Sequence, residues 1–347
     1  MMPEAPNRIS KLPFHRERTS EVAPARFVGE IVALAYLCAI AGAAKTTGFA
    51  LLLFPELAAL SHNVFTRPRG RWAGQPLRLV LTPTLTAIAG TALTRILPYN
   101  VGTILLIVCV SVLIIQLLRS VITPAISAGV LPAVLGVQSW LYPLGILCGL
   151  SLLAIMLLVW QRRFTSARAS AEGASCEQED QEAHGRIWTW LPGLLLFVVA
   201  TGIPAQLTGL RFVLFPPLIV MAYEMFGHPG ECPWKGRPLA FPAACFVAAL
   251  GGLYAVQFLG TGVIGVAAAV AWGIITLRVF RVEMPPALAV GLIPFVMNGP
   301  SFKYVISVGV GTLALSVGDL AWQRWRTGGR LPKYPTVGEI GRESSDG

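Results

Sequence analysis

The 347-residue sequence predicts an all-α, polytopic helical membrane protein made of two parallel six-segment repeats. In composition, 54% of the residues are hydrophobic and 13% are charged, and the mean hydropathy is +0.66, which lies outside the range of soluble domains. Long apolar runs recur from Phe27 to Trp322 without strand-like alternation, so helices are expected to satisfy the backbone in lipid. The two halves of the chain also match at a constant spacing of 162 residues.

The match between the halves joins residues 48–163 to residues 210–325. Glycine, proline, tyrosine and arginine recur in register, and both stretches close on a Trp-Gln-Arg run. An almost gap-free register over more than 100 residues indicates an internal duplication. The matched pairs include Pro55 and Pro217, Gly90 and Gly252, Arg119 and Arg281, Pro124 and Pro286, Gly129 and Gly291, and Tyr142 and Tyr304.

Twelve apolar segments are expected, because spanning a bilayer takes about 20 apolar residues. The second and fifth segment of each repeat are short and interrupted by proline. The segments of the first repeat lie near 28–44, 49–66, 79–97, 101–118, 121–137 and 140–160, and those of the second near 188–205, 210–226, 239–258, 262–279, 283–298 and 302–323.

Charge predicts the orientation of these segments. If all twelve cross the membrane, the basic junctions fall on the side of the N-terminus, which the positive-inside rule makes cytoplasmic. Six crossings per repeat is an even number, so the repeats enter from the same side and are parallel. We therefore expect a protein of the inner (cytoplasmic) membrane with a cytoplasmic tail (1–26), repeat 1 (27–160), a cytoplasmic linker (161–187), repeat 2 (188–326) and a cytoplasmic C-terminal tail (327–347).

Several classes of protein are disfavoured. The six cysteines and four histidines are scattered, so neither a disulfide framework nor a metal site is indicated. The sequence lacks the metalloprotease, nucleophile-elbow and phosphate-loop motifs, so we expect no enzyme and no cofactor. The net charge of +10 is explained by cytoplasmic loops rather than by nucleic acid. The expected partners are the lipid bilayer, a small anion, and a homo-oligomer or membrane complex.

Two short motifs resemble the HPP family of bacterial and plastid membrane proteins. The run Gln75-Pro76-Leu77-Arg78, which leads into the helix ending at Gly90, resembles the family's Gln-Pro-Arg run and the helix that follows it. Met284-Pro285-Pro286-Ala287 resembles the His-Pro-Pro-Ala motif, and Ile122-Thr123-Pro124-Ala125 does so more weakly. The motif histidine is replaced by Ile122 and Met284. Known members are single units with four membrane helices, so this chain resembles a fused pair of such units.

The resemblance implies a membrane protein that transports a small anion, since plastid and cyanobacterial HPP members are associated with nitrite transport. The six-plus-six layout also resembles the fusaric acid resistance and aromatic acid exporter group, which exports organic anions. Two alternatives stay open. The loss of the motif histidine and the asymmetry between the copies favour a non-transporting assembly or regulatory subunit. The other alternative is an exporter of an organic or lipid-linked anion.

Arginine and proline mark the first candidate site. Proline fits the first turn of a helix, so the fifth segments are expected to begin at Pro124 and at Pro285-Pro286, each with free N–H groups. Arg119 and Arg281 precede these starts by five residues, which would make two related anion sites. The alternative is that both arginines only end the fourth segment and obey the positive-inside rule.

Ionisable and polar residues within apolar segments are the remaining candidates. Glu56, Glu224 and His62 are costly in a membrane, so each is expected to face a cavity or a partner, and a proton-coupling role is one hypothesis. Glu224 and His62 lie near cytoplasmic ends, where water can also reach them. Asn298 and Ser301 bracket a Gly-Pro break that would suit a cavity, and a plain turn explains them equally well.

Overall fold

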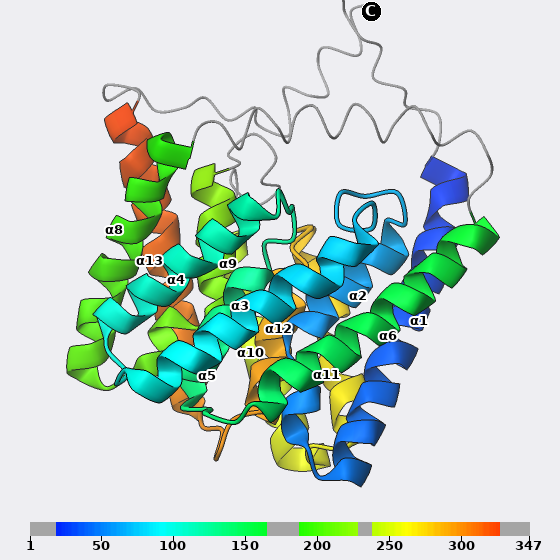
Figure 1. Cartoon of the computed structure of the whole chain (residues 1–347). Helices are drawn as coiled ribbons and strands as arrows, with labels where there is room; N and C mark the ends of the chain where they lie inside the picture. Colours follow the sequence, from blue (N-terminus) through cyan, green and yellow to red (C-terminus); the bar gives the residue numbers. More distant parts are fainter. Residues whose placement is uncertain (1–18, 165–186, 228–237, 327–347) are drawn as a thin grey trace, which may run out of the picture.

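The computed structural model describes residues 19–164, 187–227 and 238–326, and all regular elements in these ranges are helices (Figure 1). The all-α prediction is therefore confirmed for the described chain. Most of the expected N-terminal tail, linker 161–187 and C-terminal tail lie outside the described residues. Helix α1 begins at Thr19, upstream of the apolar run that predicted it.

The helices follow the same order in both halves of the chain. Each half has a long first helix, a 3-10 turn with a short helix, two further helices, a short fifth helix and a long last one. The first half contains α1 (Thr19–Thr47), η1 (Ala50–Leu52), α2 (Glu56–Thr66), α3 (Pro76–Ile96), α4 (Val101–Leu117), α5 (Ala125–Leu135) and α6 (Leu141–Phe164). The second contains α8 (Ile187–Thr208), η3 (Arg211–Leu214), α9 (Pro216–Gly227), α10 (Ala240–Leu259), α11 (Val263–Phe280), α12 (Pro286–Leu292), η4 (Ile293–Phe295) and α13 (Phe302–Arg326).

Seven of the described helices are long and apolar enough to cross a membrane, which makes this a multi-pass membrane protein. Their outer faces carry large exposed apolar side chains such as Ile155 on α6 and Ile264 on α11, as contact with lipid requires. The other apolar segments are shorter; α5, for example, has 11 residues. A helix of that length reaches about 16 Å, roughly half of the hydrocarbon thickness. The expected twelve crossings therefore remain a prediction.

Proline sets where the short helices begin. Pro55 precedes α2, Pro124 precedes α5, and Pro285 precedes α12, which itself starts at Pro286. Proline has no N–H to donate and its φ already suits a helix, so it is tolerated at the first turn. The prediction that the fifth segments start at these prolines is confirmed.

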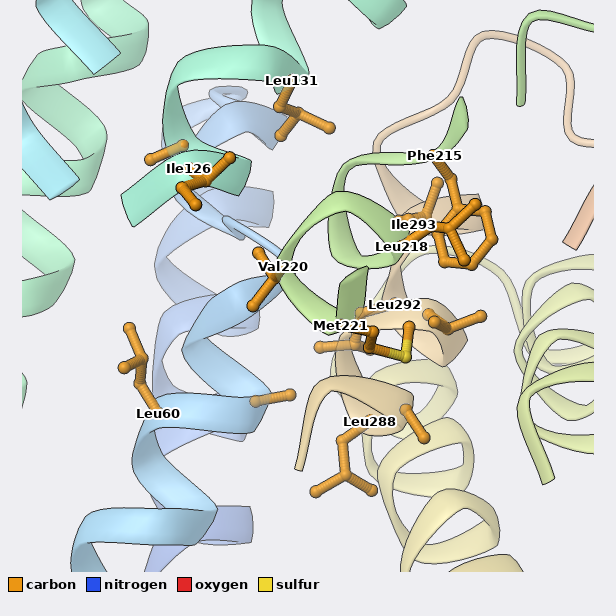
Figure 2. Packing of buried hydrophobic residues seen from close by; sticks show 14 of the residues in the cluster. Leu60, Ile126, Leu131, Phe215, Leu218, Val220, Met221, Leu288, Leu292 and Ile293 are labelled. Atoms are coloured by element: carbon orange, nitrogen blue, oxygen red, sulfur yellow. The ribbon is translucent and has the colours of Figure 1, made fainter. Parts of the chain in front are cut away.

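The four short helices α2, α5, α9 and α12 meet in the interior of the protein (Figure 2). Helix α2 packs against α12, α5 packs against α9, and α9 also contacts α12. Leu60 of α2, Ile126 of α5, Met221 of α9 and Leu288 of α12 are all buried there. Interrupted backbone is tolerated at membrane depth only where protein covers it. The burial of all four short helices meets this requirement.

Individual contacts recur between the halves at the 162-residue spacing. The Tyr142 hydroxyl donates a hydrogen bond to the Ala128 carbonyl at 2.8 Å, and the Tyr304 hydroxyl donates to the Val290 carbonyl at 2.6 Å. Each bond ties the last long helix of its half to the short fifth helix. Two of the matched glycines are in close contact, since a Cβ on Gly90 would overlap the Gly129 backbone. The Gly252 and Gly291 pair repeats that contact in the second half.

Candidate functional site

A cavity of about 450 Å³ lies between the two halves, where α1 and α2 face α11 and the loop before α12. Four arginines and two glutamates line it together with His62, so it carries a net charge of +2 with the histidine neutral. An apolar wall that includes Ile274 and Leu277 faces these groups. The six charged residues are Arg26, Glu30, Arg67, Arg278, Arg281 and Glu283.

Ion pairs that join the two halves surround this cavity. Glu283, in the loop before α12, pairs with Arg26 of α1 at 3.0 Å and with Arg67 at the end of α2. Glu30 of α1 pairs with Arg278 of α11 and lies 3.9 Å from His62 Nε2. In each pair one residue comes from the first half and the other from the second, except for Glu30 with His62. A movement of one half against the other would therefore break charged contacts at the cavity.

Arg281 lies on the cavity in an unusual backbone conformation. It ends α11 with φ 52°, in the left-handed region that glycine normally takes at a helix end. The turn is closed by hydrogen bonds from the Arg281 N–H to the Arg278 carbonyl and from the Val282 N–H to the Leu277 carbonyl. Arg119 has φ 47° and the same pair of closing bonds, from its own N–H to Gln116 and from the following N–H to Ile115.

The second half of the chain is similar to a known protein family. The model of the HPP transmembrane region matches residues 178–332, which contain α8 to α13. This part of the chain is therefore similar to the HPP transmembrane region. No curated protein matches the chain, and neither does any solved structure. The expected family resemblance is thus confirmed for the half of the chain that supplies Arg278, Arg281 and Glu283 to the cavity.

The second half of the chain also contributes to a second, much smaller cavity of about 20 Å³, which has room for about one water molecule. Glu224 of α9 and Thr123, in the loop before α5, line it with Arg71. The Thr123 hydroxyl donates a hydrogen bond to the Glu224 carboxylate at 2.6 Å. Glu224 occupies the position that matches His62, so the two cavities lie at corresponding places, one on each contact between a short second helix and the opposite half.

The structure brings some of the predicted site residues together and separates others. Arg281, Pro285 and His62 line the large cavity, and Glu224 lines the small one. Arg119 lines neither; it is exposed, and its carbonyl accepts a hydrogen bond from Arg78 at 2.8 Å. The remaining predicted residues also lie off the large cavity: Pro124 and Pro286 are buried at their helix starts, Glu56 is buried at the start of α2, and Asn298 and Ser301 lie in an exposed turn before α13.

Five charged residues of the cavity were missed by the sequence reasoning. Arg26, Arg67 and Arg278 had been explained by the positive-inside rule alone, and Glu283 carried no motif. Glu30 offered a usable signal, because it is an acidic residue within the first apolar span, and such a residue is expected to have a partner. That partner, Arg278, lies 248 residues away in the chain, which no local pattern reveals.

Proposed function

We propose that this protein is a transporter or channel for a small anion and that the anion enters the large cavity between the two halves. The observation that carries the proposal is the net positive charge of this cavity, at a contact between the halves of a multi-pass membrane protein. Low-dielectric walls strengthen the attraction of such a cavity for anions. The HPP resemblance supports a nitrite-like substrate.

The proposed architecture is a duplicated unit with twelve crossings, in which the two repeats are parallel and related by an axis along the membrane normal. The reciprocal packing of α2 on α12 and of α9 on α5 supports this relation, as do the contacts that recur at 162 residues. The positive-inside rule assigns the arginine-rich cavity to the cytoplasmic face of the inner membrane. Both chain termini and the linker would lie on that face too.

Flux of nitrite and nitrate in proteoliposomes tests the proposal. Arg281→Gln removes a positive charge from the cavity, so it should lower flux more than Arg281→Lys, which keeps the charge and loses only the planar fork of donors. Arg119→Gln is the matched control, because Arg119 has the same backbone conformation and lies off the cavity. Raised salt should reduce the difference by screening. Equal flux in empty and protein-containing vesicles would refute transport and favour an assembly or regulatory subunit.

The size of the cavity favours a second candidate substrate, an organic anion. About 450 Å³ is more than a triatomic ion needs and lies within the usual range for small-molecule sites. The apolar residues Phe27, Ile274 and Leu277 would contact the carbon skeleton while the arginines bind the acid group. Competition of nitrate flux by benzoate distinguishes the candidates, since benzoate should inhibit at lower concentration than acetate only if the apolar wall contributes to binding.

A further inference from the structure

Glu56 is a buried carboxyl group that neither lines the large cavity nor takes part in the ion pairs around it. It is the first residue of α2, and its side chain is fully buried. Within the described chain, neither of its carboxyl oxygens has a hydrogen-bond partner. The Ser127 hydroxyl of α5 is close enough to act on it, but the two groups are not in hydrogen-bonding geometry.

Among the described residues, no positively charged side chain acts on Glu56. The phenols of Tyr142 on α6 and Tyr304 on α13 lie in the environment of its charge, and both already donate their hydrogens to backbone carbonyls. On α1, Tyr36 donates to the Gly149 carbonyl, and Glu30 is paired with Arg278 beside the cavity. Residues 125–135 of α5 and 286–292 of α12 contain no titratable side chain. Apart from the Ser127 hydroxyl, the oxygens named here can accept a hydrogen bond from Glu56 more readily than donate one to it.

An ionised carboxylate in such a place is expensive, whereas a protonated one is neutral and can donate a hydrogen bond. Packing does not require an acid here, because the matching position in the second half is Leu218, which is also fully buried. A cation is a poorer occupant than a proton. Among the described residues, no group of three or more histidine, cysteine, aspartate or glutamate side chains could hold a metal ion.

We propose that Glu56 binds an exchangeable proton in the interior of the protein and that this proton moves together with the transported anion. Proton binding stands on the geometry of Glu56 alone, while the coupling rests on the proposed transport function. When Glu56 is ionised, its negative charge would repel an anion that leaves the cavity for the membrane interior. When it is protonated, that repulsion is absent, so anion and proton cross in the same direction.

Infrared spectroscopy of the purified full-length protein at pH 7 tests proton binding without any transport. The wild type should show the carbonyl stretching band of a protonated carboxylic acid, and Glu56→Gln should lack it. Glu56→Leu, which introduces the residue that the second half carries at this place, provides a second variant that keeps the fold. Thermal unfolding reports whether each variant is folded. An unchanged acid band in both folded variants, or a wild type without the band, would show that Glu56 is not protonated and would overturn the proposal.

A flux experiment in proteoliposomes tests the coupling, with nitrate as the anion because its acid does not cross the bilayer in neutral form. With one proton per anion, a gradient of one pH unit sustains about a tenfold accumulation of nitrate, because one pH unit is a tenfold ratio of protons. Wild-type vesicles with acid outside should accumulate nitrate to this extent. Glu56→Gln vesicles should only equilibrate it.

The possible failures of the two experiments are distinct. Nitrate accumulation in wild-type vesicles that does not change with the pH gradient would overturn the coupling, even if the acid band is present. The absence of any flux in wild type would overturn the proposed transport function and the coupling with it, and the infrared band would then decide proton binding alone.

Discussion

Glu283, in the loop between α11 and α12, pairs with Arg67 at the end of α2, although 216 residues separate them in the chain. The same carboxylate also holds Arg26 of α1, so one side chain of the second half binds two arginines of the first. Partial burial raises the pKa of Glu283, but the charges and hydrogen bonds of Arg67 and Arg26 outweigh it and hold the pKa below the ordinary value of 4.5.

The first prediction concerns acid stability. Because the pKa of Glu283 is lower in the folded protein than in the unfolded chain, the ion pairs stabilise the fold above the ordinary glutamate pKa, and this contribution is lost as the pH falls through the folded value. Wild type should therefore unfold at a higher temperature than Glu283→Gln at pH 7, and the difference should narrow between pH 5 and pH 3. Thermal unfolding in detergent measures both proteins. A constant difference across this range would contradict the prediction.

The second prediction concerns anion affinity. Glu283→Gln removes a negative charge from the cavity and frees Arg26 and Arg67 from their acidic partner. The concentration of nitrate at half-maximal flux should fall by about twofold to tenfold in low salt, and the gain should shrink at high salt. Concentration-dependent flux at two ionic strengths provides the measurement. A higher half-maximal concentration in the variant would show that the ion pairs form the site rather than compete with the anion.

The third prediction distinguishes the effect of backbone strain from the effect of charge at Arg119 and Arg281, the two arginines with a left-handed backbone conformation. Glycine adopts this conformation without steric cost, so Arg281→Gly and Arg119→Gly should each stabilise the protein, or at worst leave it unchanged, with a gain of up to about 1 kcal/mol. Only Arg281→Gly should lower anion flux, because only Arg281 lines the cavity. Unfolding in denaturant and flux are measured on the same preparations. Equal loss of flux in both variants would mean that the helix ends, and not the charge of Arg281, control transport.

The fourth prediction concerns the contact between the third and fifth helices of each half. A methyl group on Gly90 would overlap the carbonyl of Gly129, and a methyl group on Gly252 would overlap that of Gly291. Gly90→Ala and Gly252→Ala should each destabilise the protein by about 1–3 kcal/mol, as expected for overpacking. Gly42→Ala is the control, since its Cβ would approach the Val263 side chain at an ordinary 3.6 Å. Similar stability of Gly90→Ala and Gly42→Ala in detergent would show that α3 and α5 shift apart at little cost.

The sequence alone determined the class of fold and the positions where several helices begin. Composition required membrane helices, because unpaired backbone groups are not tolerated in lipid. Proline set the starts of α5 and α12, because its fixed φ and its missing N–H suit the first turn of a helix. The 162-residue spacing of Gly90 and Gly252, and of Gly129 and Gly291, marked equivalent positions in the two halves. These are local properties of a residue, so they can be read without knowing its neighbours in space.

Only the tertiary structure decided which of the matched residues share a site. Arg119 and Arg281 are equivalent in sequence and in backbone conformation, yet only Arg281 faces a large cavity. The difference comes from residues far away in the chain: His62, Arg26 and Arg67 meet Arg281 and Glu283 on one side of the protein, whereas Glu224 fills the corresponding place on the other with a carboxylate bound to Thr123. Long-range pairing depends on how the two halves pack against each other, and no periodicity or motif within one segment contains that information.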